Sequence, residues 1–322
     1  MASTDTAITK DKEQESGMWE GAKAPFKASY GKLMMWYFLL SDAFTFSGFL
    51  IAYGALRFSS PTWPVPDAVF QTAPFGIHTW FPGDKAPLIF VTFMSFLLII
   101  SSVTMVRAVQ EGHRENQKGV VFWMVLTILG GLGFLGCQAW EWTNLIGEEH
   151  MTVTRNPFGT HTTSGVYLNE DGSVSDETFD AGETYLIHKA GGHHGEGEHG
   201  GEGGEHAEET HDYSQGDHAG YYVNENNFLQ RKYQVTGGEY DGEVRMQSFG
   251  PMAFGALFYG ITGFHGFHVF SGVLFLIIIA INAGSGIYAA RKNGYEMVEK
   301  IGLYWHFVDL VWVFVFLVFY LL

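Results

Sequence analysis

The sequence has little cysteine, little basic charge and few charged residues of any kind. Cys137 is its single cysteine, which excludes a disulfide-stabilised scaffold. Lys and Arg total 18 against 34 Asp and Glu, a formal net charge of -16, and this sign is wrong for a nucleic-acid-binding protein. Charged residues make up only 16% of the chain, while aromatic residues also reach 16%, too many for a disordered chain.

The acidic charge is concentrated in one segment. Residues 148–247 contain 20 Asp and Glu but 5 Lys and Arg, together with 9 of the 14 His and 17 of the 41 Gly. The other 222 residues are nearly neutral and mostly apolar. The chain therefore consists of an apolar body and an acidic, Gly/His-rich insert.

Five long apolar runs make up most of the body. A membrane-spanning helix needs about 20 mostly apolar residues to cross about 30 Å of hydrocarbon. Each run is long enough, and buried helices of a soluble protein are disfavoured because the runs show little polar face. A β-barrel would show alternating ten-residue segments instead. We expect an all-α integral membrane five-helix bundle with a long acidic outer loop; the runs are 33–56, 87–106, 120–146, 251–281 and 302–322.

The distribution of Lys and Arg between the runs predicts the topology. Residues 1–32, 107–119 and 282–301 hold 11 of the 18 basic residues and would lie on the same side, which the positive-inside rule makes cytoplasmic. We expect a multi-pass membrane protein with its C-terminus and insert outside. The expected divisions are a cytoplasmic segment 1–32, helices one to three in 33–146, a periplasmic insert 147–249, and helices four and five in 250–322.

The middle of the insert, 193–218, is a low-complexity stretch of Gly, Glu and His. A solvated acidic tether is the favoured interpretation, because the irregular spacing implies no rigid ligand set. Weak metal capture is the alternative; its ligands would be His193, His194, His199, His206, His211 and His218. Stretches at 165–172, 183–189 and 221–235 mix β-forming and turn residues and are compatible with short strands or a small folded lobe.

Ionisable side chains inside the apolar runs need a reason, because burial in lipid is costly. Asp42 lies mid-run, and several other polar residues recur at spacings of three or seven, which places them on shared helix faces. Metal or haem ligation, a proton path, and hydrogen bonds between helices are the three interpretations open from chemistry alone. The residues in question are Asp42, Gln138, Glu141, His265, His268, Glu299, His306 and Asp309.

Several segments resemble the cytochrome c oxidase subunit III family, in its short five-helix bacterial form. Residues 262–272, TGFHGFHVFSG, and 304–312, YWHFVDLVW, are similar to the family's two most specific motifs. Ser41-Asp42 stands where the family has Ser-Glu or Ser-Asp, and Gln138, Glu141 and Trp142 follow its Gln-x-x-Glu-aromatic spacing. The resemblance covers about 33–146 and 244–322 and says nothing about most of the insert.

The resemblance implies a subunit without a redox centre in a proton-pumping haem–copper terminal oxidase that reduces oxygen to water. Haem and copper would belong to partner subunits, and bound phospholipid is expected. Asp42 would be a membrane carboxylate that supports proton uptake, and the other polar residues would form an internal framework. The implied partners are subunit I in direct contact, subunit II and a small subunit IV.

Other interpretations of the chain stay open. It is alternatively an accessory subunit of a quinol oxidase or nitric oxide reductase, or, in another class, a stand-alone proton or metal transporter. The insert either contacts cytochrome c or a quinol:cytochrome c oxidoreductase at the outer face, or is an unconstrained insertion. No nucleic-acid partner is expected.

Overall fold

Five long helices run through the computed structural model, which describes residues 29–70, 88–190, 213–290 and 294–322. All five are long and apolar enough to cross a membrane, and each contains or overlaps one predicted apolar run. They extend past the runs because polar residues at the ends continue the helical hydrogen bonding. The long helices are α2 (Tyr30–Ser59), α4 (Ile89–His113), α5 (Gln117–Gly147), α6 (Met252–Gly284) and α8 (Glu296–Phe316), the last continued by the π-helix η3 (Leu317–Leu321).

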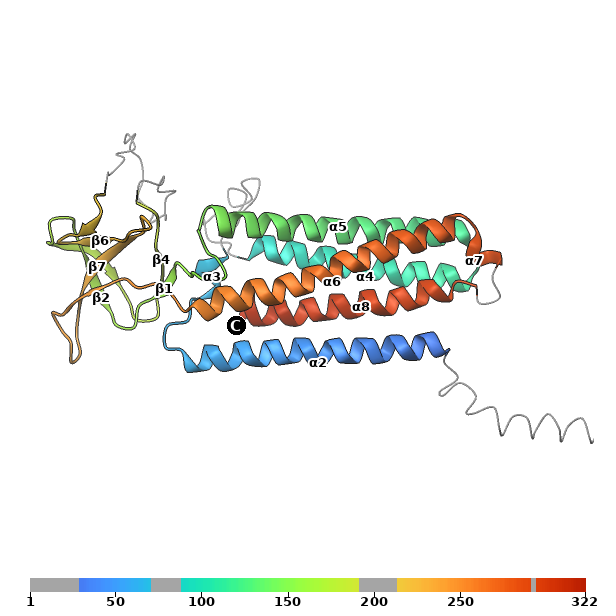
Figure 1. Ribbon diagram of the computed structural model, residues 1–322, viewed down its shortest axis with the longest axis horizontal. Helices are drawn as coiled ribbons and strands as arrows, with labels where there is room; N and C mark the ends of the chain where they lie inside the picture. The colour runs from blue at the N-terminus through green and yellow to red at the C-terminus, as the bar shows by residue number, and fades with distance from the viewer. Residues whose placement is uncertain (1–28, 71–87, 191–212, 291–293) are drawn as a thin grey trace, which may run out of the picture.

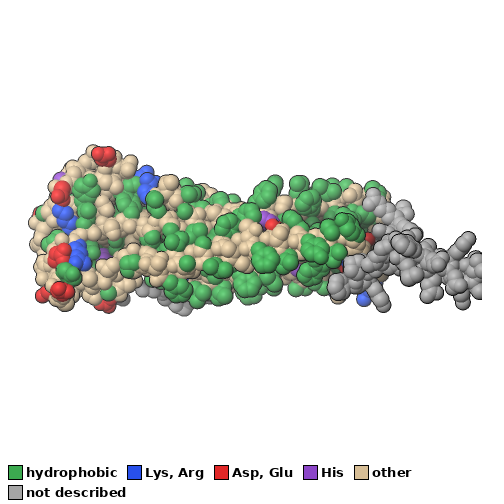
Figure 2. Space-filling view, turned by 60° about the horizontal axis from the view of Figure 1, so that its bottom comes forward, with side chains coloured by type: hydrophobic (Ala, Val, Ile, Leu, Met, Phe, Trp, Pro, Cys, Tyr) green, Lys and Arg blue, Asp and Glu red, His purple; other side chains and the backbone are tan. Residues whose placement is uncertain are grey.

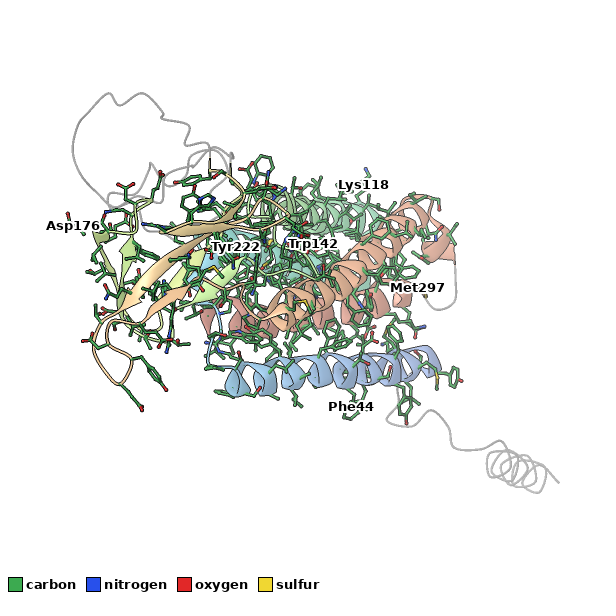
Figure 3. All side chains as sticks on the ribbon, turned by 60° about the vertical axis from the view of Figure 1, so that its left-hand side comes forward. Phe44, Lys118, Trp142, Asp176, Tyr222 and Met297 are labelled. Atoms are coloured by element: carbon green, nitrogen blue, oxygen red, sulfur yellow. The ribbon has the colours of Figure 1, made fainter. Side chains whose placement is uncertain are left out.

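Four of these helices pack together, and the fifth lies beside them. Helices α4, α5, α6 and α8 contact one another in a bundle, whereas α2 contacts α6 and α8 more sparsely (Figure 1). Figure 3 shows Phe44 of α2 pointing away from the other helices. The short helices α3 (Pro66–Val69) and α7 (Ile287–Ala290) lie at opposite ends of the bundle.

Small residues let the bundle close around a tryptophan. Trp305 of α8 is fully buried, and a Cβ added to Gly131 of α5 would lie 2.6 Å from its ring. A Cβ on Gly272 of α6 would lie 3.1 Å from the same ring. Glycine at both positions therefore makes room for the indole, as small residues do between membrane helices.

The insert forms a β lobe at one end of the bundle (Figure 1). Its larger sheet has the order β3-β2-β7-β6-β5 with β8 also paired to β7, and β1 pairs with β4 in a second sheet. The stretches 165–172, 183–189 and 221–235, which mix β-forming and turn residues, each contain a strand. The bounds are β1 Phe158–Thr160, β2 Gly165–Leu168, β3 Val174–Phe179, β4 Thr184–Leu186, β5 Gly216–Asp217, β6 Tyr221–Val223, β7 Leu229–Val235 and β8 Val244–Met246.

An aromatic cluster around one histidine fills the centre of the lobe. His161 is 2% exposed and stacks on Phe179 with ring centroids 3.6 Å apart. Its Nε2 lies 2.8 Å from the Tyr167 hydroxyl, and the Tyr185 and Tyr233 rings complete the enclosure. Burial lowers the pKa of His161 to about 4, because a charged ring would lose its hydration there.

The surfaces of the bundle and of the lobe differ in polarity, as their sequences do. The bundle shows mostly apolar side chains along its length, whereas acidic and basic side chains are mixed on the lobe (Figure 2). Apolar side chains on a helical bundle of this length fit contact with hydrocarbon rather than water.

Candidate functional site

Asp42 and His268 form a polar pair between α2 and α6. Asp42 Oδ2 lies 3.1 Å from His268 Nε2, and the two side chains are 14% and 9% exposed. Rings of Phe46 and Phe264 contact the imidazole, with centroids 5.5 and 4.6 Å away. The pair therefore lies in a largely apolar environment, where a charged group is expensive without a partner.

The hydrogen bonds of His268 fix how many protons the pair holds. Its Nδ1 lies 2.8 Å from the Phe264 carbonyl oxygen, which only accepts, so Nδ1 carries a hydrogen. The contact with Asp42 then needs one more proton, on either His268 Nε2 or the carboxyl group. The two arrangements have the same net charge, so the proton can change side without a change of charge in the membrane.

A tyrosine and a serine extend this pair to α8. The Tyr304 hydroxyl donates to the His268 carbonyl oxygen at 3.1 Å and lies 2.9 Å from Ser271 Oγ. Ser271 Oγ also lies 2.9 Å from the His268 carbonyl oxygen. Three helices thus meet at the level of Asp42, and neither Tyr304 nor Ser271 was singled out from the sequence.

Glu141 belongs to a second, separate site. Its carboxylate is fully buried in α5 and accepts from Gln138 Nε2 at 3.0 Å. The Tyr320 hydroxyl, from the π-helical turn η3, lies 3.1 and 3.0 Å from its two oxygens. Gln138 and Glu141 lie on one helix face, as their spacing predicts, but Tyr320 lies outside every motif used in the sequence analysis.

The remaining histidines and Asp309 have different neighbours. His265 is fully buried, neither ring nitrogen has a hydrogen-bond partner among the described residues, and its ring contacts Trp312 and Phe134. His306 Nδ1 lies 2.6 Å from Ser102 Oγ of α4. Asp309 is 8% exposed, and its carboxylate oxygens are buried.

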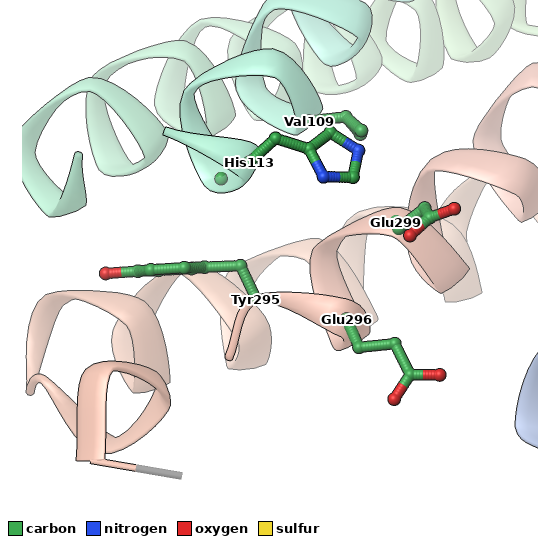
Figure 4. A pocket seen from close by; sticks show the side chains of 6 residues that line it. Val109, His113, Tyr295, Glu296 and Glu299 are labelled. Carbon is green, nitrogen blue, oxygen red and sulfur yellow. The ribbon is translucent and has the colours of Figure 1, made fainter. Parts of the chain in front are cut away.

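Glu299 lies at the far end of the bundle from the lobe. It is ion-paired with Lys32 at 2.7 Å, which joins α8 to the start of α2. A pocket of about 210 Å³ opens beside it, lined by Val109, Gly112, His113, Tyr295, Glu296 and Glu299 (Figure 4). Figure 4 shows His113 and Glu299 on opposite walls, from α4 and α8.

The predicted residues therefore occupy several small sites and not one continuous framework. Asp42 and His268 are together, as are Gln138 and Glu141, whereas His265, His306 and Glu299 each have their own neighbours. His265 and His268 both contact the Phe46 ring, but His268 lies against Asp42 of α2 and His265 against Trp312 of α8.

Metal binding was one interpretation of the histidines in the bundle and in the insert. In the described part of the chain, no three His, Cys, Asp or Glu side chains lie close enough together to hold a metal ion. His218 Nε2 lies 3.0 Å from Ser214 Oγ, and its ring stacks on Tyr221. His193, His194, His199, His206 and His211 lie outside the described residues. The bundle's histidines also fit haem or copper poorly, since those of α6 and α8 have separate surroundings.

Sequence comparison relates the last two long helices, α6 and α8, to a known family. Residues 239–322 match the model of the cytochrome c oxidase subunit III family. This segment holds the Asp42 partner His268, together with Tyr304, His306 and Asp309. The matched part is about a quarter of the chain, and it is similar to the cytochrome c oxidase subunit III family. The match supports the expected family resemblance, and the five long apolar helices support the expected transmembrane character.

Relatives of two kinds share the resemblance. The chain is 49% identical over 59 residues to a probable cytochrome c oxidase subunit 3 of Rickettsia bellii, an alignment of 18% of this chain and 21% of that protein. It is 28% identical over 159 residues to quinol oxidase subunit 3 of Bacillus subtilis, and this alignment covers 45% of this chain and 70% of that protein. It is 39% identical over 79 residues to cytochrome c oxidase subunit 3 of Alkalihalophilus pseudofirmus, and this alignment covers 23% of this chain and 35% of that protein. The chain thus matches well under two thirds of the two cytochrome c oxidase relatives' own lengths.

Proposed function

We propose that this chain is subunit III of a proton-pumping haem–copper terminal oxidase and that it assists proton uptake without taking part in electron transfer. Haem and copper would belong to subunits I and II, and oxygen would be reduced there. The chain would contact subunit I directly, contact a small subunit IV, hold phospholipid and stabilise subunit I during turnover. It would lie in a bacterial inner membrane with its N-terminus in the cytoplasm and the lobe in the periplasm.

The Asp42–His268 pair carries this proposal. The pair holds one transferable proton in an apolar environment, and Asp42 remains partly accessible, so a proton can enter and leave. Ionisable groups within membrane helices usually serve such a path or an ion site. Glu141 is instead held by two donors, Gln138 and Tyr320, which favours a structural role for that carboxyl group.

Asp42→Asn tests the role of the pair. An asparagine side chain can still donate to or accept from His268 Nε2, so the interhelical hydrogen bond is kept while the transferable proton is lost. We expect normal assembly with the haem-bearing subunits, about tenfold slower proton uptake and earlier inactivation during turnover. The measurements are co-purification, proton-uptake kinetics and activity over prolonged turnover.

Two matched variants complete the test. Asp42→Glu keeps a titratable carboxyl and should restore most of the uptake rate, whereas Asp176→Asn removes an exposed carboxylate of the lobe and should change nothing. Wild-type uptake and turnover lifetime in Asp42→Asn would refute the role of Asp42. Absence of haem-bearing partners from the purified complex would instead refute the assignment as an oxidase subunit and favour a stand-alone transporter.

A quinol oxidase is the second candidate complex. The alignment with quinol oxidase subunit 3 of Bacillus subtilis covers 70% of that protein, more than the alignments with the two cytochrome c oxidase relatives. Oxygen consumption by the purified complex, with reduced cytochrome c and with a quinol as alternative donors, decides between them. Turnover with quinol alone would exclude the cytochrome c oxidase assignment.

A further inference from the structure

Among the described residues of the acidic insert, two basic side chains lack the ion pairs that the other three have. Arg231 pairs with Glu177 at 2.7 Å, Lys232 with Asp217 at 2.6 Å, and Arg245 with Glu243 at 2.9 Å. Among the described residues, no ion pair joins Arg155 or Lys189 to a carboxylate. In a segment with 20 acidic and 5 basic residues, two cations without such pairs are unexpected.

Both of these cations lie against the same aromatic ring. Arg155 Cζ is 4.5 Å from the centroid of Phe228, and Lys189 Nζ is 5.8 Å from it. His150 contacts the ring edge-on, with centroids 6.1 Å apart. Phe228 is fully buried, so it fixes the positions of the groups around it while leaving their charges available.

This cation cluster (Arg155 and Lys189, with the ring of His150 beside them) lies where the lobe joins the bundle. His150 follows the end of α5 by three residues, and the Tyr259 hydroxyl of α6 donates to the Met151 carbonyl oxygen at 3.1 Å. Asn156 Nδ2 donates to the carbonyl oxygen of Pro251, immediately before α6. The loop that carries His150 and Arg155 is therefore fixed to the ends of two membrane-spanning helices, and Lys189 is held beside it by the Phe228 ring. The ends of such helices lie near the headgroup region of a bilayer.

Exposed apolar side chains surround the same junction. Ile146, Val153 and Met252 are 48%, 56% and 62% exposed. Apolar side chains next to basic ones are the combination with which a protein surface contacts a bilayer interface, because the former enter the acyl boundary and the latter reach phosphate. The insert as a whole has 20 acidic and 5 basic residues, so its net charge would be repelled by an anionic leaflet.

Nearby carboxylates neutralise the cluster only in part. Glu148 is exposed and acts on the charge of His150, but it makes no ion pair with either cation among the described residues. Burial raises the pKa of Glu149 to about 7, with a smaller contribution from Glu148, so its carboxyl group carries less charge near neutral pH than an exposed glutamate does. His150 itself has φ 57°, a left-handed conformation that favours glycine, yet a side chain able to contact an anion occupies it.

We propose that Arg155 and Lys189, positioned by Phe228 at the lobe end of the bundle, bind the phosphate of an anionic phospholipid headgroup and so hold the lobe against the membrane. The site is distinct from the Asp42–His268 pair and depends neither on the electron donor nor on proton uptake.

The test measures lipid binding to the full chain within its purified complex. Native mass spectrometry during titration with phosphatidylglycerol or phosphatidylcholine gives the affinity for each lipid. We expect Lys189→Gln and Arg155→Gln each to weaken phosphatidylglycerol binding at one site about fivefold, the effect of removing one cation near an anionic surface. Binding of zwitterionic phosphatidylcholine should change less.

A photoreactive group on the phosphatidylglycerol headgroup locates the site. Cross-links in the wild type should map to residues 146–156 or to the peptide around Lys189, and should be lost in the Arg155→Gln/Lys189→Gln variant. Arg245→Gln removes the same charge from an ion-paired position of the lobe and is the matched control. Arg155→Lys keeps the charge and should retain binding.

Three results would overturn the proposal. One is a Lys189→Gln variant that binds and cross-links phosphatidylglycerol as the wild type does. Lys189 is exposed, so this substitution leaves the fold intact. Another is an equal loss in Arg245→Gln, which would indicate a general charge effect. The last is full displacement of the lipid by inorganic phosphate at concentrations equal to those of the lipid, which would assign the site to free phosphate.

Discussion

The helical bundle and the β lobe solve the problem of buried polar groups differently. The bundle has a large apolar core in which Glu141 has hydrogen-bond partners and His265 lies among aromatic rings. In the lobe, a small apolar cluster of Phe179, Tyr233 and Val235, with Tyr167 packed against it, surrounds one histidine. We therefore expect the stability of the bundle to depend mainly on packing, and that of the lobe to depend also on the protonation state of His161.

The largest effect is expected from the bundle core. Trp305→Ala removes a fully buried indole that packs into the space left by Gly131 and Gly272 and donates to Ser101 Oγ at 3.0 Å. We expect a loss of about 4 kcal/mol from the free energy of unfolding, the range for large aromatic truncations. Thermal unfolding of the purified chain in detergent measures it. Trp140→Ala, at a half-exposed position on α5, is the control, and equal losses in both variants would contradict the comparison.

The next effect is confined to the lobe and depends on pH. Burial lowers the pKa of His161 from its ordinary 6.5 to about 4, so the unfolded lobe binds one more proton between these values. Stability is therefore complete above pH 6.5 and falls as the pH drops toward 4, by about 3 kcal/mol in total. Hydrogen exchange of β2 and β7 should rise over this window while that of α4 and α5 does not.

His161→Phe provides the control for that prediction. Phenylalanine keeps the stack on Phe179 but does not titrate, so the acid sensitivity of the lobe should largely disappear. If the variant lobe opened with the same pH dependence as the wild type, His161 would not be the group responsible.

The smallest effect concerns one hydrogen bond of the bundle. Tyr320→Phe leaves the aromatic packing of η3 but removes the hydroxyl that lies 3.0 and 3.1 Å from the Glu141 oxygens. We expect a loss of about 1–2 kcal/mol, since a buried carboxyl group loses one of its two partners. Thermal unfolding of Tyr320→Phe and of Glu141→Gln/Tyr320→Phe together measures the coupling between the two groups. Additive losses in the double variant would show that they do not interact.

The five helices and the grouping of Gln138 with Glu141 can be predicted from the sequence. Long apolar runs predict the helices because hydrocarbon thickness sets their length, and the spacing of Gln138 and Glu141 predicts their shared face. The partners from other helices are not visible: Tyr320 for Glu141, Ser102 for His306, and Tyr304 for His268. These contacts depend on the rotation of each helix against its neighbours, which a pattern along one helix does not determine.

The lobe was harder to predict than the bundle. Short β-rich stretches indicate strands, yet β2 lies between β3, which is near in sequence, and β7, which is some sixty residues away. His161 was not singled out, because a single histidine in a short strand-forming segment carries no signal of burial. Its environment is made by four aromatic residues from separate strands.

The contact between Asp42 and His268 joins residues 226 positions apart, and this separation sets the order of events during synthesis. Helix α2 is made first, but both helices that it contacts, α6 and α8, are made last. At 5–20 residues per second the ribosome needs roughly 10–45 s to reach His268 after Asp42. During that interval α2 must stay inserted with its carboxyl group unpaired, while two further helices and the whole lobe are completed. Any factor that shields Asp42 during this delay would raise the yield of the assembled protein without changing its final structure.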